Sequence, residues 1–328
     1  MINLRNIWRP EAYHGFGKRG PFFEGWYFKM VDASERAAYA VIPGVFIGED
    51  PAASHCFVQT LDGQTGRSAF HRYPLESFHS APDRFEIQIG PNRFTRDALS
   101  LDIARPEGEL RGDLRFAGGQ PWPVTFLSPG IMGWYALVPF MECYHGVLSF
   151  DHRIDGALTI DGQQVDFTGG RGYIEKDWGQ AFPRAWIWMQ TNHFAQTGAC
   201  LTASVAVIPW LGGAFNGFIA GLWQGGKLYR FATYTGARLE RQDVTDDRVF
   251  LVYADRRYRL EIEATRAAGG LLHSPERTAM LQRVMESLTA TIHVRLIEKQ
   301  TGLALFDDTG RRGGLEVVGQ LPPLAEAR

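Results

Sequence analysis

Acidic side chains that could transfer protons lie next to tryptophan in the segment YIEKDWG, residues 173–179. If this segment is extended, Glu175 and Asp177 point to the same face. Close like charges or an apolar environment can keep a carboxylic acid protonated near neutral pH, and such a group can act as a general acid. The alternative is a structural network in which Lys176 and a nearby arginine such as Arg171 neutralise both acids.

A further acid lies among aromatic residues near the N-terminus, in FFEGWYFKM, residues 22–30. Glu24, Trp26 and Phe28 share one face of the strand that this segment predicts. Burying a carboxylate on an aromatic wall is costly unless the group is paired, hydrogen-bonded or protonated. Glu24 is therefore another candidate acid, the partner of an arginine in an ion pair, or part of a solvent-exposed strand start.

Two indoles and two amides share one face of the next predicted strand, 185–194: Trp186, Trp188, Gln190 and Asn192. Buried amides need hydrogen-bond partners, so this face lines either a ligand pocket with a polar end or a wide barrel interior. In PFMECYHG, residues 139–146, Glu142 and Tyr144 share a face and could join the same site. A single histidine such as His145 is expected to be structural.

Short alternating segments separated by turns predict an all-β, mainly antiparallel fold. Hairpin-type turn signals such as Asp62-Gly63 and Gly225-Gly226 recur along the chain. The exception is one helix expected near 275–288, where Ser274-Pro275-Glu276 offers a helix start and apolar residues follow at a spacing of three to four. The 328 residues suffice for two domains, which we place at 1–172 and 173–328.

Composition and motifs exclude several function classes. The formal net charge of −2 gives no electrostatic reason to expect a nucleic-acid partner. Gly15, Gly17 and Gly20 spell GxGxxG, but a strand begins where the dinucleotide fold needs a helix. The nine histidines show no paired metal spacing. We therefore expect no nucleotide, no cofactor and no metal.

The sequence also indicates where the protein works. We expect no signal peptide, and no stretch of about 18 apolar residues occurs in the sequence. The three cysteines are far apart and odd in number, which fits a reducing compartment. We expect a cytoplasmic location, and contact with a membrane surface is an additional expectation.

Two tryptophan-rich stretches, FFEGWYFKM and YIEKDWGQAFPRAWIWMQTNHF, resemble the signatures of the tocopherol cyclase family. ESLTATIHVRL and GRRGGLEVVG fit its C-terminal part, so the resemblance covers nearly the whole chain. It implies two lipocalin-like β-barrel or sandwich halves, similar to those of carotenoid hydratases and some fungal pericyclases. It also implies an isomerase (an intramolecular lyase) of the kind used in vitamin E biosynthesis, which closes a prenylated hydroquinol to a chromanol without a cofactor.

Under this resemblance the reaction begins with a proton transfer to a trisubstituted alkene, which gives a tertiary carbocation. Glu175 is the first candidate for the acid, followed by Asp177 and Glu24. The remaining candidates would bind the substrate, stabilise the cation through ring faces or orient its hydroxyl groups: Trp26, Phe28, Glu142, Tyr144, Trp178, Trp186, Trp188, Gln190 and Asn192. Two alternatives remain open, a lipocalin-like carrier of prenylquinones or other lipids, and a hydratase or cyclase that acts on another isoprenoid.

Overall fold

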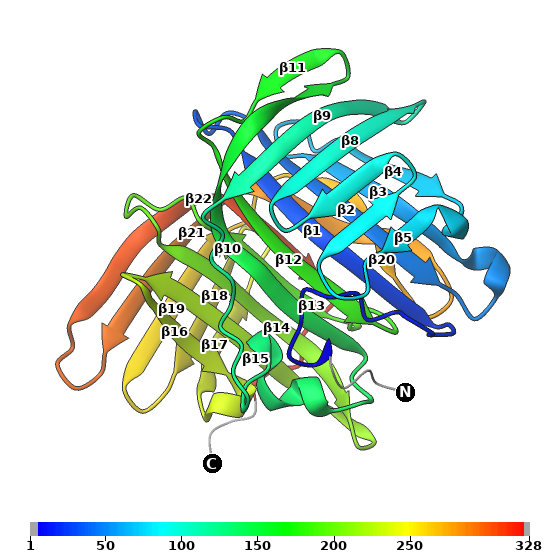
Figure 1. Ribbon diagram of the computed structural model, residues 1–328. Helices are drawn as coiled ribbons and strands as arrows, with labels where there is room; N and C mark the ends of the chain where they lie inside the picture. Colours follow the sequence, from blue (N-terminus) through cyan, green and yellow to red (C-terminus); the bar gives the residue numbers. More distant parts are fainter. Residues whose placement is uncertain (1–5, 325–328) are drawn as a thin grey trace. The chain divides into compact units, whose positions relative to one another are not determined.

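The computed structural model describes residues 6–324 and consists mainly of antiparallel strands in two sheets (Figure 1). The chain divides into two compact units. The first unit runs from the N-terminus to Phe182 and includes Gly270–Arg283; the second comprises Pro183–Gly269 and the chain from Val284 onward. The boundary expected after residue 172 falls inside strand β12 (Arg171–Gly179), which pairs on both sides with strands of the first sheet.

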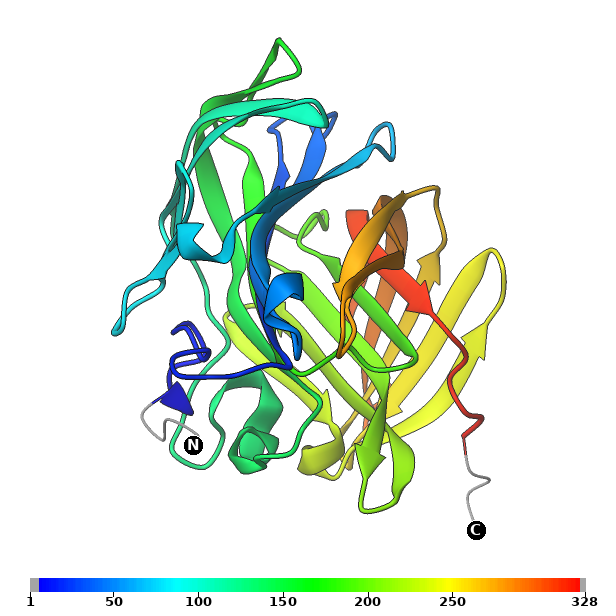
Figure 2. The same ribbon diagram turned by 90° about the vertical axis from the view of Figure 1, so that its right-hand side faces the viewer.

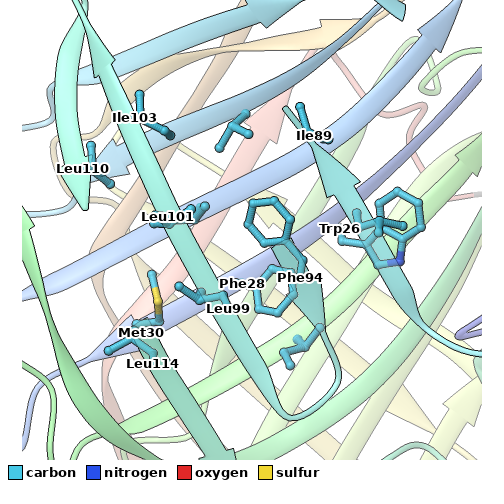
Figure 3. Close-up of a cluster of buried hydrophobic side chains, with 14 of the residues drawn as sticks. Trp26, Phe28, Met30, Ile89, Phe94, Leu99, Leu101, Ile103, Leu110 and Leu114 are labelled. Atoms are coloured by element: carbon cyan, nitrogen blue, oxygen red, sulfur yellow. The ribbon is translucent and has the colours of Figure 1, made fainter. Parts of the chain in front are cut away.

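The first sheet has twelve strands. Their order is β4 (Ser68–Tyr73), β3 (His55–Asp62), β2 (Ala38–Ile47), β1 (Phe22–Val31), β12, β10 (Cys143–Ile160), β9 (Gly108–Ala117), β8 (Ala98–Arg105), β7 (Asn92–Thr95), β6 (Glu86–Ile89) and β5 (Phe78–Ser80), and β11 (Gln163–Asp166) pairs with β10. This sheet curves around its own core, because Phe28 on β1 meets distant strands. Its ring centroid lies 5.8 Å from that of Phe94 on β7 and 6.0 Å from that of Phe116 on β9. Figure 3 shows Trp26, Phe28 and Phe94 within this buried cluster.

The second sheet has ten strands. Their order is β16 (Lys227–Ala232), β15 (Gly213–Gln224), β14 (Cys200–Trp210), β13 (Trp186–Thr191), β22 (Ala304–Val318), β21 (Met280–Glu298), β19 (Tyr258–Thr265), β18 (Arg248–Ala254) and β17 (Arg238–Val244), and β20 (Gly270–Pro275) pairs with β21. This sheet also curves on itself, because Phe218 on β15 contacts Tyr253 on β18 at a centroid distance of 5.4 Å. The two curved antiparallel sheets confirm the predicted all-β fold of two lipocalin-like halves.

The prediction of a helix near 275–288 is wrong, because residues Met280–Glu298 form strand β21. From Val284 to Leu296 every second side chain is buried, and this period of two extends further along the chain than the helical spacing does. Leu281 and Met285, which belonged to the expected helical stripe, are 48% and 49% exposed. Short 3₁₀ turns connect strands, among them η2 (Pro51–Ala53), η3 (Leu75–Ser77), η4 (Gly130–Leu137) and η5 (Thr233–Thr235). Within residues 6–324, no helix is long and apolar enough to cross a membrane.

Candidate active site

The three candidate acids, Glu175 and Asp177 on β12 and Glu24 on β1, lie on two opposite faces of the first sheet. Trp178 and Ile174 pack with the core of the first unit, so alternation directs Glu175 and Asp177 to the opposite face. Glu24 on β1 lies directly across the ladder from Trp178 and therefore shares the core-side face. The three acids predicted as candidates do not form one group.

On the core-side face, Glu24 and Lys176 form an ion pair in which both side chains are fully buried. His14 donates its backbone N–H to Glu24 Oε2 at 2.8 Å, and its Nδ1 lies 3.3 Å from Oε1. Lys176 also donates to the carbonyl of Ala12 at 2.7 Å. Burial would raise the pKa of Glu24, but Lys176 and His14 together hold it below its usual value. Glu24 is therefore an ionised partner of a lysine, and the geometry favours the ion-pair alternative for it.

Aromatic rings enclose this ion pair. The Lys176 Nζ atom lies 4.9 Å from the ring centroids of both Trp26 and Trp178, a cation–π arrangement. His14 and Tyr144 both stack on Trp178, with centroid distances of 4.2 and 5.6 Å. Trp26 and Trp178 thus help to compensate the buried Lys176 charge, Tyr144 packs on Trp178, and Phe28 lies in the core of the unit.

On the opposite face, a histidine lies between the two acids of β12. His145 on β10 pairs with Asp177 in the ladder, and its Nδ1 lies 2.8 Å from Asp177 Oδ1. Its Nε2 lies 3.5 Å from Glu175 Oε2, and the Tyr173 hydroxyl donates to the same carboxylate. We call these residues the proton-sharing cluster: Tyr173, Glu175, Asp177 and His145. Lys176 and Arg171, expected to neutralise the acids, pair instead with Glu24 and with Asp151.

The two carboxylates determine the charge of His145. Burial alone would lower the pKa of His145, but the negative charges of Glu175 and Asp177 and the hydrogen bond to Asp177 raise it to about 9. The imidazole is therefore protonated at neutral pH. Its proton on Nε2 faces Glu175, so the cluster can supply a proton to that carboxylate and accept one from it.

The same atoms could offer ligands to a metal ion. Among residues 6–324, ligand atoms of His145, Glu175 and Asp177 lie within 4.8 Å of one another. The observed contacts instead place the imidazolium in a hydrogen bond with Asp177 and at ion-pair distance from Glu175, and a metal would have to displace the imidazole protons. The arrangement is suited to proton transfer.

Glu142 marks the end of the β10–β12 pair. Its carbonyl accepts the backbone N–H of Gln180 at 2.8 Å. A Cβ at Gly179 would lie 2.2 Å from the same carbonyl oxygen, so this close approach explains the glycine that follows Trp178. Burial raises the pKa of the half-buried Glu142 carboxyl, and the charge of Arg277 opposes that shift. Within residues 6–324, no hydrogen bond or ion pair joins Glu142 to the Glu24–Lys176 pair or to the proton-sharing cluster.

The other candidates lie on strand β13 of the second unit. Ile187 and Met189 enter the core of that unit, so Trp186, Trp188 and Gln190 share the opposite face, as the alternation predicts. All three are buried, as is Asn192 just beyond the strand. The indole N–H of Trp186 donates to Glu316 Oε2 at 2.6 Å. The role of these four residues in substrate binding stays a prediction.

Solved structures share this architecture. The chain is similar to a protein described as AttH from Nitrosomonas europaea, with 12% identity, a TM-score of 0.54 and coverage of 91% of this chain and 93% of that one. It is also similar to CghA bound to Sch210972, with 11% identity, a TM-score of 0.57 and coverage of 91% and 88%. Kievitone hydratase from Nectria haematococca matches with 14% identity, a TM-score of 0.51 and coverage of 94% of both chains. At these identities the likeness establishes the fold alone.

Sequence comparison defines the family more closely. The chain belongs to the tocopherol cyclase-like family, which matches residues 121–319. It is 28% identical to the probable chloroplastic tocopherol cyclase of Oryza sativa subsp. japonica, over 94% of this chain and 78% of the relative. It is also 28% identical to the chloroplastic tocopherol cyclase of Zea mays, over 96% of this chain and 78% of the relative. The matched family region contains the whole proton-sharing cluster.

Proposed function

We propose that this protein is an enzyme that closes a prenylated hydroquinol to a chromanol by proton-initiated cyclisation. The observation that carries this proposal is the proton-sharing cluster, in which a protonated imidazole lies between two carboxylates. The reaction needs a proton donor in a shielded environment, and Glu175 is only 5% exposed. Membership of a family whose named relatives are tocopherol cyclases supports the same reaction.

In the proposed mechanism Glu175 donates the proton and His145 replenishes it. The imidazolium passes its Nε2 proton to Glu175 across the 3.5 Å gap, and the carboxylic acid protonates the less substituted alkene carbon. The phenol oxygen then captures the tertiary cation and forms the ring ether, and the phenol proton returns to the cluster. Asp177 keeps the imidazole oriented through Nδ1. Substrate and product are isomers, so no atom is gained or lost.

The prenyl tail supplies much of the binding energy in this proposal. Burying hydrocarbon contributes about 0.8 kcal/mol for each CH₂ group, and the shielded environment strengthens electrostatic contacts with the developing cation. The electrostatic support for the cation comes first from the Glu175 carboxylate, which becomes negative as the cation forms. We therefore expect the ionised cluster to stabilise the cation until the phenol oxygen reacts.

The test is to incubate purified protein with 2,3-dimethyl-6-phytyl-hydroquinol under anaerobic conditions and to separate the products by chromatography with mass detection. A chromanol with the same mass as the substrate supports cyclisation. A product heavier by one water identifies a hydratase, and tightly bound but unchanged hydroquinol identifies a carrier. Either of these two results would reject the proposed reaction for this substrate.

A further inference from the structure

The connection between β9 and β10 of the first unit carries no charged residue before its last one, Glu142. Between Arg115 and Glu142 the sequence contains no Asp, Glu, Lys, Arg or His. Several large apolar side chains in this connection face solvent, and we call them the apolar tip: Val124 (41% exposed), Phe126 (80%), Leu127 (84%), Trp134 (44%), Leu137 (47%) and Phe140 (55%). Surfaces of this kind mark interaction sites in soluble proteins.

The N-terminal arm of the same unit extends this surface. Trp8 stacks on Phe126 with a centroid distance of 5.9 Å and donates its indole N–H to the Phe126 carbonyl at 3.1 Å. Phe16 on the arm is 48% exposed, and the exposed residues Lys18 and Arg19 follow it. Figures 1 and 2 show the blue arm and the teal connection side by side. The surface thus combines an uncharged apolar part with basic residues on the adjoining arm.

We propose that the apolar tip docks the protein on an anionic lipid surface. Phe126 and Leu127 project from a loop, and a fluid bilayer can adapt to projecting side chains, whereas a protein partner would need a matching pocket. The absence of charge suits entry into the acyl boundary, and the indoles of Trp8 and Trp134 suit the interface between headgroups and hydrocarbon.

Charge complementarity selects the lipid. Lys18 and Arg19 are exposed on the same N-terminal arm whose Trp8 stacks on Phe126 of the tip. In this proposal they contact anionic headgroups while the tip enters the acyl region. The net charge of the whole chain is −2, so attraction to an anionic surface must come from such a local basic group. This proposal concerns the surface alone and does not depend on the proposed reaction.

The test measures co-sedimentation of the purified protein with vesicles of phosphatidylcholine, with and without phosphatidylglycerol, and uses no substrate. We expect wild-type protein to bind the phosphatidylglycerol vesicles and the double variant Phe126→Asp/Leu127→Asp to bind them about tenfold more weakly or less. Leu303→Asp is the matched control, because Leu303 is 58% exposed in a turn beside the charged residue Lys299. Lys18→Glu/Arg19→Glu should weaken binding to the anionic vesicles more than to the neutral ones.

Circular dichroism and sedimentation velocity complete the experiment. The variants should keep the wild-type spectrum, and wild type and Phe126→Asp/Leu127→Asp should have the same oligomeric state. Equal vesicle binding by wild type and the double variant would overturn the proposal. So would absent binding by wild type, or a wild-type oligomer that the double variant dissociates without any binding to vesicles. Because no substrate is present, these results are independent of the outcome for the proposed reaction.

Discussion

Lys176→Met tests the assignment of Glu24 to a structural ion pair. The substitution leaves the Glu24 carboxylate buried, with the His14 contacts but without its cation. Both side chains of the pair are 0% exposed, and removing one partner of a buried pair costs about 3–5 kcal/mol, because the remaining charge is not compensated. The loss of the two indole contacts of Lys176 adds to this cost. We expect the free energy of unfolding to fall by about that amount.

The assay is urea unfolding followed by tryptophan fluorescence, with the double variant Lys176→Met/Glu24→Gln as the comparison. The double variant removes both charges, and the amide oxygen of the introduced glutamine can still accept the His14 backbone N–H, so we expect it to be more stable than Lys176→Met alone. Such a result gives a coupling free energy for the pair. If Lys176→Met changed the stability by less than about 1 kcal/mol, the value typical of an exposed pair, the account of Glu24 would be refuted.

Three further predictions concern the proton-sharing cluster and its surroundings. Glu175→Gln should lower turnover at least about 100-fold, the usual range for loss of a general acid, while the substrate Kd stays near that of wild type. Glu109→Gln is the control, because it changes a surface residue and should leave turnover intact. A fully active Glu175→Gln enzyme would exclude Glu175 as the acid. Because the His145 pKa is raised to about 9, turnover should be full at neutral pH and fall as the pH rises through 9. The stabilisation from the protonated form should be fully present below about pH 6.5, the ordinary pKa of histidine, and be lost as the pH rises through 9. His145→Gln should remove the alkaline limb of the pH–rate profile, and an unchanged limb would contradict the assignment. Gly179→Ala should destabilise the protein by about 1–3 kcal/mol in urea unfolding because its Cβ meets the Glu142 carbonyl. Gly213→Ala serves as the control, because its Cβ would meet only the Trp210 carbonyl oxygen, at an ordinary contact distance of 3.7 Å.

Sequence alternation predicted the strands and the face of each side chain within a strand. It placed Glu24 with Trp26, and Trp186 with Trp188, correctly on shared faces. It could not show which face of β1 aligns with which face of β12, because ladder register depends on pairing between distant segments. The sequence therefore offers Glu24 and Glu175 as alternatives for the same role, the acid that donates the proton, although the two residues lie on opposite faces of the sheet.

The same limit explains why His145 was treated as structural. It lies 32 residues from Asp177 in the chain, and only the pairing of β10 with β12 brings the imidazole between two carboxylates. Tyr173 was missed although it lies two positions before Glu175 on the same face, a spacing that could have identified it. The helix near 275–288 failed for a different reason. Apolar residues at 280–288 fit a helical spacing locally, and the alternation through Leu296 outweighed it.

The most direct test of the proposed proton transfer is to carry out the reaction with 2,3-dimethyl-6-phytyl-hydroquinol in D₂O. After back-exchange of the hydroxyl group in H₂O, the account predicts a chromanol that carries one deuterium on the carbon next to the new quaternary centre, and the loss of this product in Glu175→Gln. A chromanol without deuterium at that carbon would show that ring closure does not begin with protonation of the alkene by an exchangeable acid, and would contradict the account.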